Sequence, residues 1–227
     1  MEIKLIVLQT KHLPQMKTFY TDTLGFDLVK EAEDSFRIAV GTGEMEFTTK
    51  TAEDDPYYHF AFNLPANKFY EAKSWIKEKV NLLVEDGADE ADFAHLPAHA
   101  LYFYDPSGNI VELISRHGTA DESSEPFSVN SIVNISEIGL IVEDAMAAGE
   151  RLNELGLNER DGHPISRQFL NFMGEKENGV FIILAQPGRR WIFSDKLSAI
   201  YPLEITLMNN NKIIVSPNKE LLIRQNG

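Results

Sequence analysis

The sequence predicts an α+β fold built from repeated βαβββ modules, and three observations predict it. The order strand, helix, strand, strand, strand occurs within the first fifty residues. That order restarts near residues 58 and 135, a period of about 50–60 residues, which is typical of an internally repeated architecture. The composition, 43% hydrophobic and 25% charged over 227 residues, is that of an ordinary folded protein.

The first module begins with the apolar run 3–8, which is short enough for a buried strand. Leu13, Met16 and Leu24 then recur at helical spacing, and Gly25 ends the predicted helix. Three further strands are predicted at 27–30, 35–40 and 44–49.

The second module repeats this order. Residues 58–64 form a strand pattern, and Pro65 leads a predicted helix with Phe69, Ala72 and Ile76 on one stripe, ending near Val80. Strands are predicted at 81–85, 99–104 and 109–115. Asp105-Pro106-Ser107-Gly108 has strong turn chemistry and joins the last two strands.

A small, polar and acidic stretch, 117–131, is predicted to be a linker, with a long loop inside one domain as the alternative. It separates a two-module domain, 1–116, expected to close one curved sheet, from degenerate module material at 132–227. In the latter, a strand at 135–142 and a helix ended by Gly156 precede strand-like runs at 169–173, 179–185, 203–208 and 212–215.

Charge and cysteine content limit the function classes. A net charge of −14 argues against nucleic acid and anionic membranes as partners, and no apolar run approaches a membrane span. The chain has no cysteine, so it has no disulfide, zinc ribbon or iron–sulfur cluster, and any metal must bind His, Asp or Glu. We expect a cytoplasmic protein that acts on a small molecule.

Three segments resemble the vicinal-oxygen-chelate superfamily of glyoxalases, fosfomycin- and bleomycin-resistance proteins and extradiol dioxygenases. They are FYTDTLGF at 19–26, HFAFNLP at 59–65 and YFYDPSGNIVELI at 102–114, the last being the most specific. The resemblance covers 1–116, and 132–215 more weakly. It implies glyoxalase-like paired modules that form an incomplete barrel around a site.

The resemblance also implies four metal-ligand positions, on the first and last strands of each module. They fall on Leu5, Glu46, His59 and Glu112, and leucine cannot bind a metal. We therefore expect Glu46, His59 and Glu112 to be the ligands. Two carboxylates and an imidazole suit a divalent ion such as Zn²⁺, Ni²⁺, Mn²⁺, Fe²⁺ or Mg²⁺, and a protein that has lost its metal remains an alternative.

Strand parity assigns partners to these residues. With a four-residue loop at 105–108, His99 and Glu112 are predicted to lie on one face, within side-chain reach. Glu46 is predicted to share a face with Ile38 in the same way. Glu112 and His99 are therefore the candidate catalytic residues, with His99 as a proton carrier, a hydrogen-bond donor to a ligand or a substitute ligand.

The third module offers no ligand at the implied positions, which fall on Ser136 and Ile182. It is expected to serve packing, dimerisation or a cavity wall, with a homodimer as the expected assembly. Trp191 and Phe193 are interpreted either as pocket lining or as surface packing. The remaining histidines lie in turn-like or terminal segments and are not expected to act: His12, His95, His117 and His163.

Three functions remain open. The first is a metal-dependent lyase or isomerase that stabilises an enediolate-type anion of a small oxygen-bearing substrate. The second is a metal-free protein that binds or sequesters a small molecule, as bleomycin-resistance proteins do. The third is a non-haem iron dioxygenase with His59, His99 and Glu112 as its triad.

Overall fold

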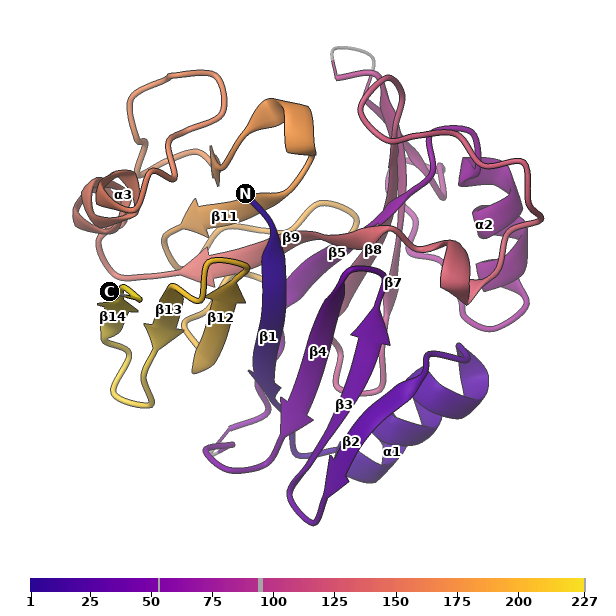
Figure 1. The fold of residues 1–227 in the computed structure, drawn as a ribbon, viewed down its shortest axis with the longest axis horizontal. Coiled ribbons are helices and arrows are strands. Elements are labelled where there is room, and N and C mark those ends of the chain that lie inside the picture. Colours follow the sequence, from indigo (N-terminus) through magenta and orange to yellow (C-terminus); the bar gives the residue numbers. More distant parts are fainter. Residues whose placement is uncertain (53, 94–95, 227) are drawn as a thin grey trace.

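The computed structural model describes residues 1–52, 54–93 and 96–226, and two curled seven-stranded sheets dominate it (Figure 1). The first sheet has the order β14-β13-β12-β1-β4-β3-β2. Its strands are β1 (Ile3–Gln9), β2 (Leu28–Ala32), β3 (Ser35–Val40), β4 (Gly43–Thr48), β12 (Leu203–Leu207), β13 (Lys212–Val215) and β14 (Leu221–Arg224).

The second sheet has the order β10-β11-β9-β5-β8-β7-β6. Its strands are β5 (His59–Leu64), β6 (Ala91–Phe93), β7 (Ala98–Tyr104), β8 (Ile110–Arg116), β9 (Asn134–Ile141), β10 (Asn171–Met173) and β11 (Phe181–Ala185). The predicted fold class, an α+β protein of paired glyoxalase-like βαβββ modules forming a half-barrel, is confirmed.

The helices are few and short: α1 (Leu13–Thr18), which continues as the π-helical turn η1 (Phe19–Thr23), α2 (Phe69–Lys77) and α3 (Ala145–Glu154). Two 3₁₀ turns, η2 (Val129–Ser131) and η3 (Lys176–Asn178), lie in the connections. Gly25 follows the first helix with φ of 85°, a conformation that glycine adopts without strain. No helix within the described residues is long and apolar enough to cross a membrane.

The pairing of the modules differs from the prediction. Residues 1–116 were expected to close one sheet, but β1 pairs with β12 whereas β5 pairs with β9, so the first two modules lie in different sheets. Both β12 and β9 come from the C-terminal half, and each runs antiparallel to the strand with which it pairs. The apolar pattern of a strand predicts that it is buried but carries no information about which strand covers its free edge.

One smaller prediction is wrong, and two strands were missed. The strand expected at 81–85 is reduced to an isolated bridge between Leu82 and Phe103, whereas β6 and β14 were not predicted.

The second sheet lies deeper in the molecule than the first, since every residue of β5 and β11 is buried. A polar side chain on these strands therefore has to find its partners within the protein.

Candidate metal centre

Three ionisable side chains meet on one face of the second sheet. Ala61 of β5 pairs with Glu112 of β8 on one side and with Glu137 of β9 on the other, so both glutamates share its face. His59 lies two residues before Ala61 and points the same way. Each of the three acidic or imidazole side chains offers one ligand atom within 4.8 Å of the others.

The imidazole faces both carboxylates. His59 Nε2 lies 3.4 Å from Glu112 Oε2 and 3.8 Å from Glu137 Oε2. His59 Nδ1 lies 3.1 Å from the carbonyl oxygen of Ile110. If Nδ1 donates its hydrogen to that carbonyl, the lone pair of neutral His59 is on Nε2 and points at the carboxylates. Such an arrangement needs a proton or a cation between the groups.

Burial and mutual repulsion give the two carboxyl groups different pKa values. Burial, followed by the nearby Glu137 carboxylate, raises the pKa of Glu112 to about 8. Burial also tends to raise the pKa of Glu137, but His59 and Arg116 outweigh it and hold that pKa below its ordinary value. Burial would lower the pKa of His59, yet the two carboxylates raise it. The metal-free centre therefore retains protons at neutral pH.

A loop from the C-terminal half covers the centre. We call residues 188–198 the cover segment; its ends are joined by a hydrogen bond of 2.8 Å from Gly188 N to Ser198 O. Trp191 packs on His59 with ring centroids 4.7 Å apart, and Phe193 stacks on Tyr102 at 5.0 Å. Trp191 and Phe193 are only 5% and 8% exposed, and Trp191 lines a hollow beside His59, which agrees with the pocket-lining interpretation for this residue.

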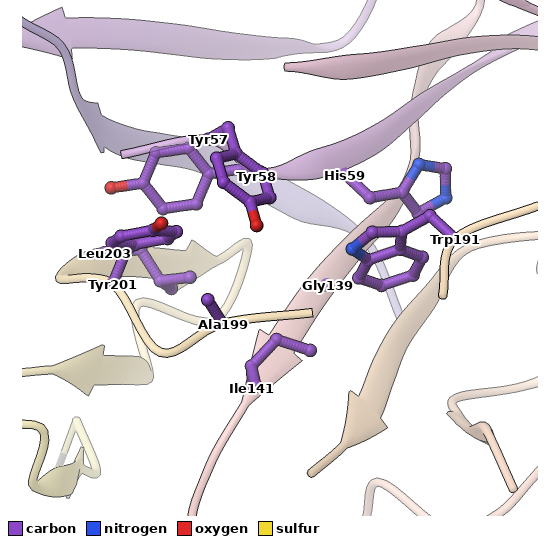
Figure 2. A pocket seen from close by; sticks show the side chains of 9 residues that line it. All are labelled: Tyr57, Tyr58, His59, Gly139, Ile141, Trp191, Ala199, Tyr201 and Leu203. Carbon is purple, nitrogen blue, oxygen red and sulfur yellow. The ribbon is translucent and has the colours of Figure 1, made fainter. Parts of the chain in front are cut away.

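Figure 2 shows the indole of Trp191 beside the imidazole of His59, with Tyr57, Tyr58 and Tyr201 on the far side of a small hollow. The hollow holds about 10 Å³, room for roughly one water molecule. Gly139 leaves space for the indole, because a Cβ atom there would lie 3.1 Å from the ring. The hollow reaches the centre at His59, and Trp191 of the cover segment forms part of its wall.

Glu137 was missed by the sequence analysis. The alignment of ELGL with TLGF placed the ligand position on Ser136, one residue too early. Ser136 instead donates a hydrogen bond to the carbonyl oxygen of Gly179, on the other face of β9. A glutamate directly after the aligned position, inside an apolar strand, was the signal that could have found it.

The structure does not bring Glu46 to His59 and Glu112. Glu46 lies on β4 in the first sheet and accepts hydrogen bonds from Arg37 Nε at 2.9 Å and Nη2 at 2.7 Å. Arg37, not the predicted Ile38, is its cross-strand partner. The hairpin loop is one residue shorter than expected, since Val40 already pairs with Gly43, and a one-residue slip moves a side chain to the other face.

The predicted pairing of the strand that carries His99 is also wrong by one residue. Tyr104 pairs with Ile110, so Tyr102 lies opposite Glu112 and His99 lies opposite Ser115. His99 therefore faces away from the centre. Its Nδ1 lies 2.7 Å from Nε2 of His117. The other ring nitrogen of His117, Nδ1, lies 3.0 Å from the carbonyl oxygen of Ala66.

The other histidines were not expected to act. His12 lies 3.9 Å from the exposed Asp55, and His95 lies outside the described residues. His163 is near Glu159 and Asp161, but this loop is solvent-exposed and Asp161 is already paired with Arg160 and Lys176. We regard it as a surface ion-pair network.

The three side chains on the second sheet fit a divalent cation. One imidazole nitrogen and two carboxylate oxygens suit ions of hard or borderline character. Both carboxyl groups are buried, and of the two, Arg116 forms an ion pair with Glu137 alone. His59, Glu112 and Glu137 are therefore the residues that could hold a metal.

Two family models match the chain. Residues 2–113 match the model described as Glyoxalase/Bleomycin resistance protein/Dioxygenase superfamily. Residues 135–189, which include Glu137, match the model described as Toxoflavin-degrading enzyme. None of the curated proteins matches the chain.

The chain is also similar to several solved structures, and the first of them shows the same fold. A candidate dioxygenase from Bacillus subtilis subsp. subtilis str. 168 is 18% identical, covers 81% of this chain and 63% of its own, and superimposes with a TM-score of 0.54. A lactoylglutathione lyase from Agrobacterium tumefaciens is 17% identical over 50% of this chain and 92% of its own, with a TM-score of 0.43. A candidate glyoxalase family protein from Bacillus anthracis is 18% identical over 51% and 95%, with a TM-score of 0.40.

Proposed function

Since the first half of this chain, residues 2–113, belongs to the Glyoxalase/Bleomycin resistance protein/Dioxygenase superfamily, we propose that the protein is a metal-dependent enzyme acting on a small oxygen-bearing substrate. The observation that carries the proposal is the buried convergence of His59, Glu112 and Glu137 within 4.8 Å. Buried like-charged carboxylates around an imidazole lone pair are destabilising unless a cation or a proton lies between them. Lyase or isomerase chemistry is the reaction class we propose.

His59, Glu112 and Glu137 would hold the cation, which when bound supplies a Lewis acid that stabilises negative charge developing on adjacent substrate oxygens. The chain itself supplies the proton chemistry. Glu112 is the candidate to move a proton, and the Tyr102 hydroxyl beside it remains protonated because burial and Glu112 raise its pKa. Trp191 and Phe193 exclude water from these groups.

A narrower candidate follows from the second family match. Residues 135–189 resemble the model of a toxoflavin-degrading enzyme and contribute Glu137 to the centre. We therefore propose toxoflavin as the first substrate to assay. An iron-dependent dioxygenase using His59, Glu112 and Glu137 is the alternative reaction class. Oxygen uptake during turnover would favour it, whereas turnover without oxygen uptake would favour a lyase or isomerase.

The direct test is a metal titration followed by a substrate assay. The metal-free protein is titrated with Mn²⁺, Ni²⁺, Zn²⁺, Fe²⁺ and Mg²⁺, and the loaded forms are incubated with toxoflavin and with other small oxygen-bearing substrates. The expected result is one cation per chain and consumption of one substrate only by loaded protein. No binding of any ion would overturn the proposal in favour of a metal-free binding or resistance protein.

A cytoplasmic location, a homodimer and a domain division at 117–131 stay predictions.

A further inference from the structure

Arg116 lies at the end of β8, four residues after Glu112, and its side chain is only 13% exposed. Its Nη1 donates hydrogen bonds to Asn63 Oδ1 and to Ser136 Oγ, each at 2.6 Å. Its Nη2 donates to Oε1 of Glu137. The guanidinium therefore bridges β5 and β9, the two strands that carry His59 and Glu137.

The neighbours of Arg116 are themselves fixed. Asn63 Nδ2 donates to Asn134 Oδ1 at 2.8 Å and to the Gly179 carbonyl at 2.9 Å, so its amide oxygen is left for Arg116. Ser136 donates its hydroxyl hydrogen to the same Gly179 carbonyl and accepts from Arg116. The three hydrogen bonds from Nη1 and Nη2 to these fixed acceptors hold the guanidinium in one orientation.

The orientation of Arg116 decides how Glu137 is presented. Oε1 of Glu137 is occupied by the arginine, whereas Oε2 points at His59 Nε2, 3.8 Å away. We propose that Arg116 is a positioning residue that makes Glu137 offer one oxygen, Oε2, to the cation of the proposed centre. This inference rests on the proposed metal-dependent function.

Arginine is suited to this role in a way that lysine is not. Two different nitrogens of one planar group reach Ser136 and Glu137 at the same time, which a single ammonium on a flexible stem cannot reproduce. Lysine would keep the positive charge beside Glu137. The substitution Arg116→Lys therefore separates the geometry of the fork from its charge.

The experiment measures Mn²⁺ binding by isothermal titration calorimetry, together with the electron paramagnetic resonance spectrum of the bound ion. We expect Arg116→Lys to weaken Mn²⁺ binding by about 10–100-fold, the usual effect of losing a partner of a ligand, and to change the spectrum. Arg151→Lys is the matched control, because Arg151 donates to the Leu221 carbonyl, which lies outside the centre. It should bind Mn²⁺ as the wild type does.

The outcomes separate the two proposals. Wild-type affinity and an unchanged spectrum in folded Arg116→Lys would overturn the positioning role while leaving the metal centre intact. Failure of the wild type to bind Mn²⁺ or any of the other four ions would overturn the centre itself, and the positioning role with it. If Arg116→Lys does not fold by circular dichroism, Ser136→Ala decides instead, since it removes one acceptor of the same guanidinium: a several-fold loss of Mn²⁺ affinity supports the role and unchanged affinity overturns it.

Discussion

The two sheets contain the same arrangement of strands and acids, but only one of them forms a candidate centre. In the first sheet Val7 of β1 pairs with Glu46 of β4 and with Glu204 of β12. In the second sheet Ala61 pairs with Glu112 and Glu137 in the same parallel and antiparallel senses. Both sheets thus place two carboxylates on one face, either side of a central strand.

The residues around these acids differ. Leu5 stands two residues before Val7, the position that His59 has before Ala61. Arg37 is the cross-strand partner of Glu46, where Tyr102 is the partner of Glu112. Glu204 is paired with Lys212 at 2.5 Å. The carboxylates of the first sheet are therefore neutralised by cationic side chains, and the imidazole is replaced by an apolar group.

Burial differs as well. The Glu46 and Glu204 side chains are 13% and 29% exposed, whereas those of Glu112 and Glu137 are 4% and 6% exposed. The cover segment packs on the second sheet through Trp191. We infer from the comparison that two carboxylates in register are not enough for a metal site. We expect an imidazole, a carboxylate without a competing cation and a cover to be needed as well.

Removing the imidazole should have the largest effect. His59→Ala takes one of three ligands from the second sheet, so Mn²⁺ affinity should fall by more than about 100-fold, beyond the loss typical of an outer partner. Turnover should be lost with it. Equilibrium dialysis measures the affinity, and Leu5→Ala, the corresponding change in the first sheet, is the control that should leave binding unchanged. Equal losses in both variants would contradict the difference between the sheets.

Metal binding should depend strongly on pH. The pKa of Glu112 is about 8 in the metal-free protein, so a cation has to displace its proton below that pH. Mn²⁺ affinity should rise about tenfold per pH unit between pH 6 and 8 and then level off. Because this pKa lies above the ordinary 4.5, the metal-free protein also loses stability as pH rises from about 4.5 to 8.

Calorimetry in two buffers of different ionisation enthalpy checks this prediction by counting released protons. Release of one or more protons per cation at pH 7 is expected. A pH-independent affinity across this range would mean that Glu112 is ionised before the metal arrives.

Loosening the cover should change rates more than affinities. Glu85 accepts a hydrogen bond of 2.5 Å from Phe193 N and forms an ion pair with Arg190. These two contacts stabilise the cover segment in its position over the centre. Glu85→Gln should speed Mn²⁺ release to a chelator by about twofold to fivefold, as expected for a partly exposed ion pair. Stopped-flow fluorescence in a Trp75→Phe background follows Trp191 alone, because the chain has two tryptophans.

The matched control for this experiment is Glu90→Gln, which breaks an ion pair with Lys73 away from the cover segment. It should leave the release rate unchanged. The same acceleration in both variants would indicate general loosening of the fold.

The smallest effect is expected from rebuilding the first sheet. Leu5→His alone should add no second cation, since Arg37 still occupies Glu46. Leu5→His with Arg37→Tyr copies the residues of the second sheet and should add a weak second site, at least about 100-fold poorer because no cover excludes water. Mn²⁺ stoichiometry rising above one in the double variant alone is the expected result. Two tight sites in Leu5→His would show that Arg37 does not matter.

The sequence predicted the repeated modules and two of the three residues that meet, because apolar periodicity and the resemblance both act at the level of a single strand. Register was less predictable. The lengths of both hairpin loops were wrong by one residue. The error in the second loop assigned His99 in place of Tyr102 to the face of Glu112. Glu137 was missed because the alignment of the third module on the first placed the ligand position one residue early, on Ser136. Which strand pairs with which edge depends on long-range packing that no local pattern encodes.

The central claim is that the second sheet alone holds one cation, on His59, Glu112 and Glu137. Mn²⁺ stoichiometry by equilibrium dialysis, compared between Glu137→Gln and Glu46→Gln, tests it most directly, since the two glutamates occupy opposite sheets. We expect one cation per chain in the wild type and in Glu46→Gln, and close to none at the same Mn²⁺ concentration in Glu137→Gln. Loss of the cation in Glu46→Gln with retention in Glu137→Gln would contradict the account.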